Sequence, residues 1–215
     1  MKYISYIRKR FNDPRSPVFR LSELRLIKGL SGGYLKLLIH NLSAKGEIIR
    51  ITKGVYTFKK DADVLCFAFE PSYYGLEDAL SIMGISEQGT NPTILTVRNV
   101  RRGVRSFIGR NYSVYHLDKQ FFFGYELLRR GDYWIPVSDV EKTVIDLIQF
   151  KVYLREELWS EILPKMDMKK LATYLEKYPP SLREAVTSEI KRHKKTRRSL
   201  TPGSKIDEDH GYLYK

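Results

Sequence analysis

Cysteine is nearly absent from this sequence, because Cys66 is the one cysteine among 215 residues. An internal disulfide needs two cysteines and a cysteine metal cluster needs several, so both are excluded. Cys66 lies in an apolar run over residues 64–69, where a cysteine usually acts as a small, inert hydrophobe rather than as a nucleophile. Histidine is also scarce, and the four histidines lack metal-ligand spacing: His40, His116, His193 and His210.

Motifs that carry chemistry are missing as well. The sequence has no phosphate-binding glycine loop, no zinc-ligand spacing and no G-x-S-x-G elbow. No run approaches the roughly eighteen apolar residues of a membrane span. Residues 1–4 lack the apolar core of a signal peptide. We therefore expect a cytoplasmic protein that contacts no membrane, is not an enzyme, and has no cofactor, metal or catalytic residues.

Acidic residues are scarce only near the beginning of the chain. The formal net charge is +13. Residues 1–60 hold fourteen Lys and Arg against three Asp and Glu, whereas residues 61–150 hold nine against twelve and residues 151–215 fifteen against ten. A charge asymmetry of this sign indicates an anionic partner for the first segment. The alternative is a basic, solvated surface without a partner.

The basic segment has the element order of a winged helix-turn-helix. Residues 1–11 and 22–28 have helical apolar spacing, with Ser22 as the N-cap and Gly29 as the end of the second helix. Another helix starts at the N-cap Ser31, and its buried stripe is predicted at Leu35, Leu38, Ile39 and Leu42. Residues 47–52 and 55–58, joined by Lys53-Gly54, predict a β-hairpin, which serves as the wing.

This order and charge predict binding of double-stranded DNA over residues 1–60. The third helix would enter the major groove, and the wing would reach phosphates. The expected DNA-binding residues are Ser31, Gly32, Gly33, Tyr34, Lys36, His40, Asn41, Arg50, Lys53, Lys59 and Lys60.

Residues 61–150 predict an α+β domain with mainly antiparallel strands. The run 64–69 fits either a buried strand or a short buried helix. A helix is expected over 73–85, and strands over 93–97, 112–117, 121–126 and 133–137. Ser138 and Glu141 form a capping box that opens a helix through Phe150. The carboxylates Asp139 and Glu141 then belong to a helix's first turn rather than to a catalytic site, and Asp146 alone makes no site.

Residues 151–198 predict a helical C-terminal extension, and residues 199–215 a mobile tail. Helices are expected over 155–163, 168–178 and 181–195, the last with a second capping box at Ser181 and Glu184. The basic run over 191–198 fits either a solvated helix end or a second DNA contact.

Three stretches carry a family resemblance. Residues 18–24 (VFRLSEL) lead to K-G-V-Y at 53–56, residues 73–84 read YYGLEDALSIMG, and residues 135–147 read IPVSDVEKTVIDL. In this order they resemble the abortive-infection type IV antitoxin family of transcriptional regulators (AbiEi-like), although Gly75 stands where the family pattern has Ser.

The resemblance implies a repressor of its own operon that binds inverted repeats. It also implies that the C-terminal domain counteracts a nucleotidyltransferase-like toxin of a type IV toxin–antitoxin system. We expect a homodimer on the operator. Two alternatives stay open: a protein-interaction module that neutralises the toxin without specific DNA binding, and a nucleic-acid-processing enzyme whose acidic centre forms only in three dimensions.

Overall fold

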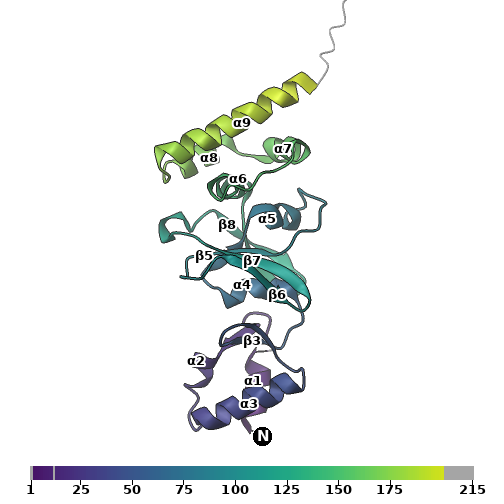
Figure 1. Ribbon diagram of the computed structural model, residues 1–215, viewed down its shortest axis with the longest axis vertical. Helices are drawn as coiled ribbons and strands as arrows, with labels where there is room; N and C mark the ends of the chain where they lie inside the picture. Colours follow the sequence, from purple (N-terminus) through teal and green to yellow (C-terminus); the bar gives the residue numbers. More distant parts are fainter. Residues whose placement is uncertain (1, 12, 201–215) are drawn as a thin grey trace, which may run out of the picture.

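The computed structural model describes residues 2–11 and 13–200, with side chains from 3–11 and 13–195. The molecule is elongated (Figure 1). An N-terminal unit of helices and a small sheet, a larger central sheet, and a group of C-terminal helices follow one another along its long axis. Helices and an antiparallel-rich sheet occupy separate layers, so the predicted α+β class is confirmed.

The N-terminal unit has the predicted element order. It contains α1 (Lys2–Phe11), β1 (Val18–Arg20), α2 (Leu21–Leu24), α3 (Gly32–Ala44), β2 (Ile49–Thr52) and β3 (Val55–Thr57). The strands form an antiparallel sheet in the order β1-β3-β2. α3 begins after Ser31 as predicted, because Ser31 Oγ accepts a hydrogen bond from Tyr34 N at 3.3 Å. The predicted apolar stripe of α3 is buried against α1 and β1: Leu35, Leu38, Ile39 and Leu42.

The second helix is shorter than predicted, and Ser22 is not its N-cap. α2 follows Arg20, whose backbone N–H donates to Glu23 Oε2 at 3.1 Å. The carboxylate of Glu23, three residues into the helix, thus satisfies the backbone amide of the N-cap residue Arg20. The regular helix ends at Leu24, and turns lead to Gly29, which takes a φ of 83°.

The central sheet has six strands in the order β6-β7-β5-β4-β9-β8. Three strand pairs are antiparallel, whereas β4 with β9 and β5 with β7 are parallel. The elements of this region are η1 (Ala62–Val64), α4 (Leu65–Ala68), β4 (Ser72–Tyr74), α5 (Leu76–Ile82), β5 (Thr93–Thr96), β6 (Gly103–Phe107), β7 (Arg110–His116), η2 (Lys119–Phe121), β8 (Tyr125–Arg130) and β9 (Tyr133–Ser138).

Two predictions for this region are wrong, and one ambiguity is resolved. The run 64–69 is helical, in η1 and α4. Tyr73 belongs to β4 and pairs with Leu95 of β5, so α5 starts only at Leu76. The expected strand over 121–126 is mostly a 3-10 turn and a loop, because Phe122 packs on the rings of Tyr73 and Tyr125 instead of joining a ladder.

The C-terminal helices are α6 (Val140–Gln149), α7 (Glu156–Ile162), η3 (Leu163–Lys165), α8 (Met168–Leu175) and α9 (Pro180–Leu200). The N-cap of α6 is Asp139, which accepts from Lys142 N at 2.8 Å, so the predicted capping box at Ser138 is wrong. Ser138 instead ends β9, and its hydroxyl lies 2.6 Å from Thr143 Oγ1. α9 begins at Pro180, before the predicted Ser181, and extends into the predicted tail; residues 201–215 lie outside the described residues.

Two hydrophobic cores lie on the two faces of the central sheet. One core joins Tyr73 and Leu95 to α5 and α6, and also to buried residues of α7, α8 and α9 such as Trp159 and Val186. Residues 151–195 therefore complete this core. The other core joins α4 and the opposite sheet face to Ile51 of the N-terminal sheet. Packing is thus continuous across residues 60 and 61, where the change in composition predicted a boundary. No helix within the described ranges is both long and apolar enough to cross a membrane.

Candidate nucleic-acid interface

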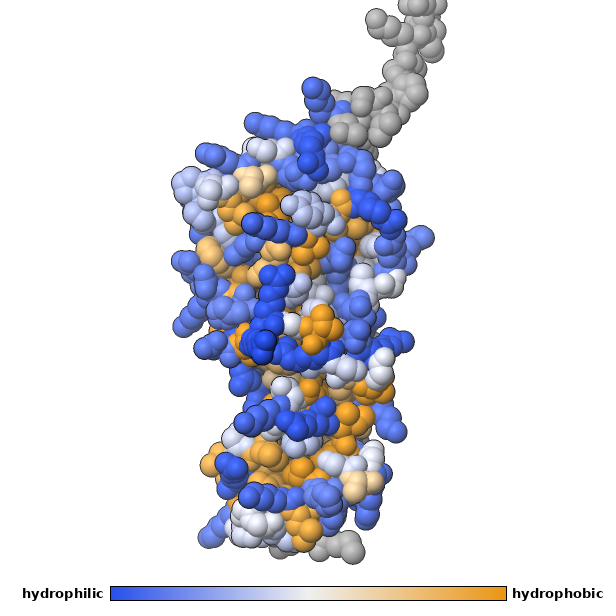
Figure 2. Space-filling model, in the orientation of Figure 1, coloured by the Kyte–Doolittle hydropathy of each residue, from blue (hydrophilic) through white to orange (hydrophobic). Residues whose placement is uncertain are grey.

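A groove of about 940 Å³ runs between α3 and the β2–β3 hairpin. The turn after α2 contributes Arg25 to its lining, α3 contributes Gly32, Lys36 and His40, and the hairpin contributes Arg50. Apolar side chains form the floor: Leu21, Leu35, Ile39, Ile48, Ile49 and Tyr56. Ser43 and Gly46 complete the lining. Figure 2 shows the mixture of hydrophilic and hydrophobic surface on the N-terminal unit, at the lower end of the view.

The charged residues that line this groove are all basic. The three carboxylates of residues 1–60 each form an ion pair elsewhere: Asp13 with Arg15 at 2.7 Å, Glu23 with Arg20 at 3.4 Å, and Glu47 with Arg8. Arg25, Lys36 and Arg50 have no ion-pair partner within the described residues. The groove therefore carries uncompensated positive charge next to an apolar floor.

The predicted α3 residues divide between two sides of the helix. Gly32, Lys36 and His40 line the groove. Tyr34 and Asn41 lie on the other side, because a helix turns by about 100° per residue. The ring of Tyr34 lies 6.1 Å from that of Tyr3 on α1. A helical wheel could have separated these two residues from Lys36.

Two predicted glycines and one predicted cap lie at the exposed start of α3. A Cβ added to Gly32 or Gly33 would meet no atom within 4 Å, so the surface there is open. Ser31 is exposed and caps the helix. This leaves the first turn of α3 accessible to a large ligand.

The predicted DNA-binding residues of the wing also lie in different places. Arg50 lines the groove, and Lys53 is exposed at the hairpin turn beside Gly54, whose φ is 75°. Lys59 is half-buried after β3. Lys60 borders a different cavity, which Asp61 and Asp63 also line. Of the basic groove residues, sequence reasoning missed Arg25, because its place on the groove depends on the early end of α2.

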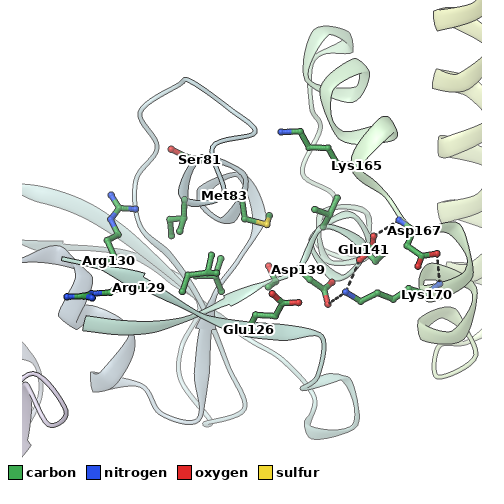
Figure 3. A pocket seen from close by; sticks show the side chains of 15 residues that line it. Ser81, Met83, Glu126, Arg129, Arg130, Asp139, Glu141, Lys165, Asp167 and Lys170 are labelled. Carbon is green, nitrogen blue, oxygen red and sulfur yellow. Dashed lines mark hydrogen bonds and ion pairs between the residues drawn. The ribbon is translucent and has the colours of Figure 1, made fainter. Parts of the chain in front are cut away.

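A second cavity of about 910 Å³ lies in the middle region, between α5, β8, the start of α6, and α8 (Figure 3). Arg129 and Arg130 lie on one side of it, and Asp139, Glu141 and Lys170 on the other. The remaining lining residues are Ser81, Ile82, Met83, Glu126, Leu128, Val137, Ser138, Val140, Lys165 and Asp167.

The two carboxylates at the start of α6 are fully engaged. Asp139 caps the helix and accepts from Tyr174 Oη at 2.8 Å and from Lys170 Nζ at 3.1 Å. Glu141 accepts from Asp167 N at 2.7 Å and lies 3.2 Å from Lys170 Nζ. Partial burial lowers the pKa of Lys170, but its bonds to both carboxylates outweigh that effect and raise the pKa. These contacts fasten α8 to α6, which is a structural role.

Asp146 lies in the protein interior with Lys142. Both side chains are fully buried, and Lys142 Nζ donates to Asp146 Oδ1 while Tyr73 Oη donates to Oδ2 at 2.8 Å. The Lys142 Nζ is 5.5 Å from the ring centroid of Phe123 and 5.7 Å from those of Tyr73 and Tyr178. Burial raises the pKa of Asp146 and lowers that of Lys142, and each partner's charge opposes the shift. Among the described residues, no group of three or more His, Cys, Asp or Glu is arranged to hold a metal ion.

Comparison with known proteins agrees with the N-terminal resemblance. Residues 12–59 match the family described as "Transcriptional regulator, AbiEi antitoxin", so the predicted relationship is confirmed for this region. No curated protein matches the chain. The chain is similar in fold to the RV2827C protein from Mycobacterium tuberculosis, with a TM-score of 0.57 and 12% identity over 90% of this chain and 78% of that one.

Proposed function

We propose that this chain is a sequence-specific regulator that binds double-stranded DNA through a winged helix-turn-helix in its N-terminal unit. The observation that carries the proposal is the groove whose charged lining, Arg25, Lys36 and Arg50, has no carboxylate partner. The match of residues 12–59 to AbiEi antitoxin regulators supports the same assignment.

The groove geometry supports different roles for its residues. Lys36 and His40 project from α3, so they are the residues that reach base edges when α3 enters the major groove. Arg25 and Arg50 flank the helix and contact phosphates, which sets the register and supplies most of the affinity. Tyr34 and Asn41, on the other side of α3, contact the sugar-phosphate backbone of the DNA at the edge of the major groove.

Substitution of the groove cations tests this assignment. Arg50→Ala should lower the slope of log affinity against log salt by about one if Arg50 neutralises one phosphate. Lys36→Ala should instead relax the sequence preference at one position, because it removes a base contact. Lys169→Ala, at the far end of the molecule, is the control and should bind as the wild type does. Wild-type binding by both groove variants at every salt concentration would contradict the proposal.

The proposal extends to the role of the regulator in the cell. We place the protein in the cytoplasm, where it represses its own operon as a homodimer on an inverted repeat and acts as the antitoxin of a type IV system. It acts by binding rather than catalysis, in keeping with the structural engagement of Asp139, Glu141 and Asp146. A reporter fused to its own promoter should be silenced by the chain and released by Lys36→Ala.

The proposed toxin partner is a nucleotidyltransferase-like protein encoded beside this chain. The open cavity next to the edge strand β8, with exposed Glu126 and Arg129, offers it a polar surface. Co-expression should restore growth to cells that carry the toxin, and Lys36→Ala should still do so because the cavity is remote from α3. Failure of the wild-type chain to restore growth would contradict the antitoxin role without affecting the DNA-binding role.

A further inference from the structure

Strand β8 is an open edge of the central sheet. Within the described residues, β9 is the one strand that pairs with it, so its outer side joins no ladder. Five of its six residues are exposed, and Leu128 is half-buried. An exposed edge is a template for pairing with another strand unless its sequence discourages such pairing.

An apolar patch accompanies this edge. The exposed fraction is 59% for Leu127, 59% for Trp134 and 40% for Tyr125. Arg129 pairs with Trp134 in the β8–β9 ladder, and side chains alternate between the two faces along a strand. Tyr125, Leu127, Arg129 and Trp134 therefore share one face. Apolar surface that gathers in this way beside an open edge is typical of an interaction site.

The sequence of β8, Tyr-Glu-Leu-Leu-Arg-Arg, is complementary to itself in an antiparallel arrangement. When Leu127 faces Leu127 of a second copy, Tyr125 faces Arg129 of that copy, and the two-fold axis repeats this contact. A guanidinium beside an aromatic ring is attractive. Glu126 is then diagonal to Arg130 of the second copy, within reach of long side chains. This register places no like charges directly opposite each other.

The other edge of the sheet, β6, has the opposite character. Residues 98–110, which include β6, hold five arginines and no acidic residue. Two copies that met at this edge would bring only positive charges together, which discourages pairing. Of the two edges of the central sheet, β8 is therefore the one that suits a second copy.

Pairing through β8 would place both N-terminal units on the same side of the joined sheet. The N-terminal sheet packs on one face of the central sheet through Ile51, and the C-terminal helices pack on the other through residues such as Trp159. A strand that pairs antiparallel with its own copy has a two-fold axis perpendicular to the sheet, so each face continues into the same face of the copy. Figure 1 shows α3 at the end of the N-terminal unit farthest from the central sheet. Both α3 helices would then point in one direction, toward a single duplex.

We propose that β8 pairs with β8 of a second copy of this chain, centred on Leu127, and that this edge forms the dimer on the operator. The inference rests on the proposed function, for which it names the dimer surface. One six-residue strand makes an interface smaller than the about 1,200 Å² of stable complexes, so the dimer forms mainly where a duplex holds two chains side by side. Glu126 and Arg129 also line the cavity proposed for the toxin, so the toxin and the second copy would compete for this surface.

A disulfide across the edge tests the pairing directly. Leu127→Cys places two thiols opposite each other in the proposed register, at a Cα separation that a disulfide tolerates. Under mild oxidation on a duplex of the upstream region, this variant should form a covalent dimer. Val104→Cys, at an exposed position of β6, is the matched control and should stay monomeric, and the buried Cys66 is common to both. Equal amounts of covalent dimer from the two variants, or none from Leu127→Cys, would overturn the proposed edge.

Operator binding gives a second test. Leu127→Lys sets two like charges opposite each other, and because the position is exposed the fold should be retained, which thermal unfolding verifies. The variant should bind a duplex with both half-sites about tenfold or more weakly than the wild type does, and a duplex with one half-site equally well. Val104→Lys makes the same change on β6 and should bind both duplexes as the wild type does.

The outcomes separate this inference from the proposed function. Equal affinity of the wild type and Leu127→Lys for the duplex with both half-sites would overturn the β8 pairing and leave the regulator role intact. Wild-type operator binding by Leu127→Lys together with loss of growth restoration would assign the edge to the toxin instead. Absence of DNA binding by the wild type would overturn the proposed function, and the dimer on the operator with it.

Discussion

Tyr112 donates its hydroxyl hydrogen to the carbonyl oxygen of Ile51 at 2.9 Å, and this bond joins β7 of the central sheet to β2 of the N-terminal unit. Tyr112 and Ile51 are both buried in the core that the two parts share. The orientation of the groove relative to the central sheet is therefore fixed by packing as well as by this hydrogen bond.

Removal of the Tyr112 hydroxyl should weaken this junction. Tyr112→Phe leaves the ring in place but leaves a buried carbonyl without its donor, so we expect a loss of about 1–2 kcal/mol in the free energy of unfolding. Chemical denaturation measures it, with Tyr125→Phe as the control, since the Tyr125 side chain is exposed. A larger loss in the control than in Tyr112→Phe would contradict the importance of this bond.

The buried pair of Lys142 and Asp146 should be sensitive to loss of either partner. Asp146→Asn leaves an unpaired ammonium group in the core, so we expect a loss of about 3–5 kcal/mol in the free energy of unfolding. Lys142→Met combined with Asp146→Asn removes both charges and should recover part of that loss. Additive losses in a double-mutant cycle would show that the two side chains do not act as a pair.

Asp78 should give the protein a stability that falls as pH rises through the acidic range. Burial raises the pKa of Asp78 from 3.8 to about 6, despite hydrogen bonds from Thr93 N and Thr90 Oγ1. The folded state thus binds this proton more tightly than the unfolded state, and the free energy of unfolding contributed by Asp78 decreases between about pH 4 and 6.

Asp78→Asn removes this effect because its amide does not ionise. It should raise the free energy of unfolding at pH 7.5 by an amount on the order of 1–3 kcal/mol, and by less at pH 4. Denaturant unfolding at both pH values gives the comparison. A variant less stable than the wild type at pH 7.5 would show that the hydrogen bonds of the carboxylate outweigh its desolvation.

Gly75, which precedes α5, should not tolerate a side chain. A Cβ at Gly75 would lie 2.5 Å from Leu95 Cδ1 and 3.3 Å from the Tyr73 ring. Gly75→Ala should therefore cost about 1–3 kcal/mol of stability through overpacking. Gly89→Ala is the matched control, because a Cβ there meets nothing within 4 Å. Equal melting temperatures for the two variants would contradict this explanation.

Sequence reasoning succeeded where a local pattern decides the structure. The stripe of Leu35 and Leu38 predicts α3, and the glycine turn at Lys53-Gly54 predicts the hairpin. It failed where tertiary pairing decides: Tyr73 fits a helix locally, yet it pairs with Leu95 in the sheet. Strand order and the parallel pairs also arise from contacts far apart in the chain.

The candidate interface was predicted only in part, because local patterns reveal some of its residues and tertiary contacts place the others. Lys36, His40 and Arg50 were found from charge and element order, and the structure brings them to one groove. Arg25 was missed because its position follows from the short α2. The arginines over residues 98–110 are apparent in the sequence, but only the fold brings Arg98 and Arg20 to the same carbonyl oxygen of Ala68.

Binding of the wild-type chain to a duplex of its own upstream region, titrated with salt beside a scrambled duplex of equal length, tests the central claim most directly. We predict that the native duplex binds more tightly, and that its affinity falls roughly a thousandfold between 50 and 200 mM salt for about six neutralised phosphates. Equal affinity for both duplexes, or no binding at moderate salt, would contradict the assignment of a sequence-specific regulator.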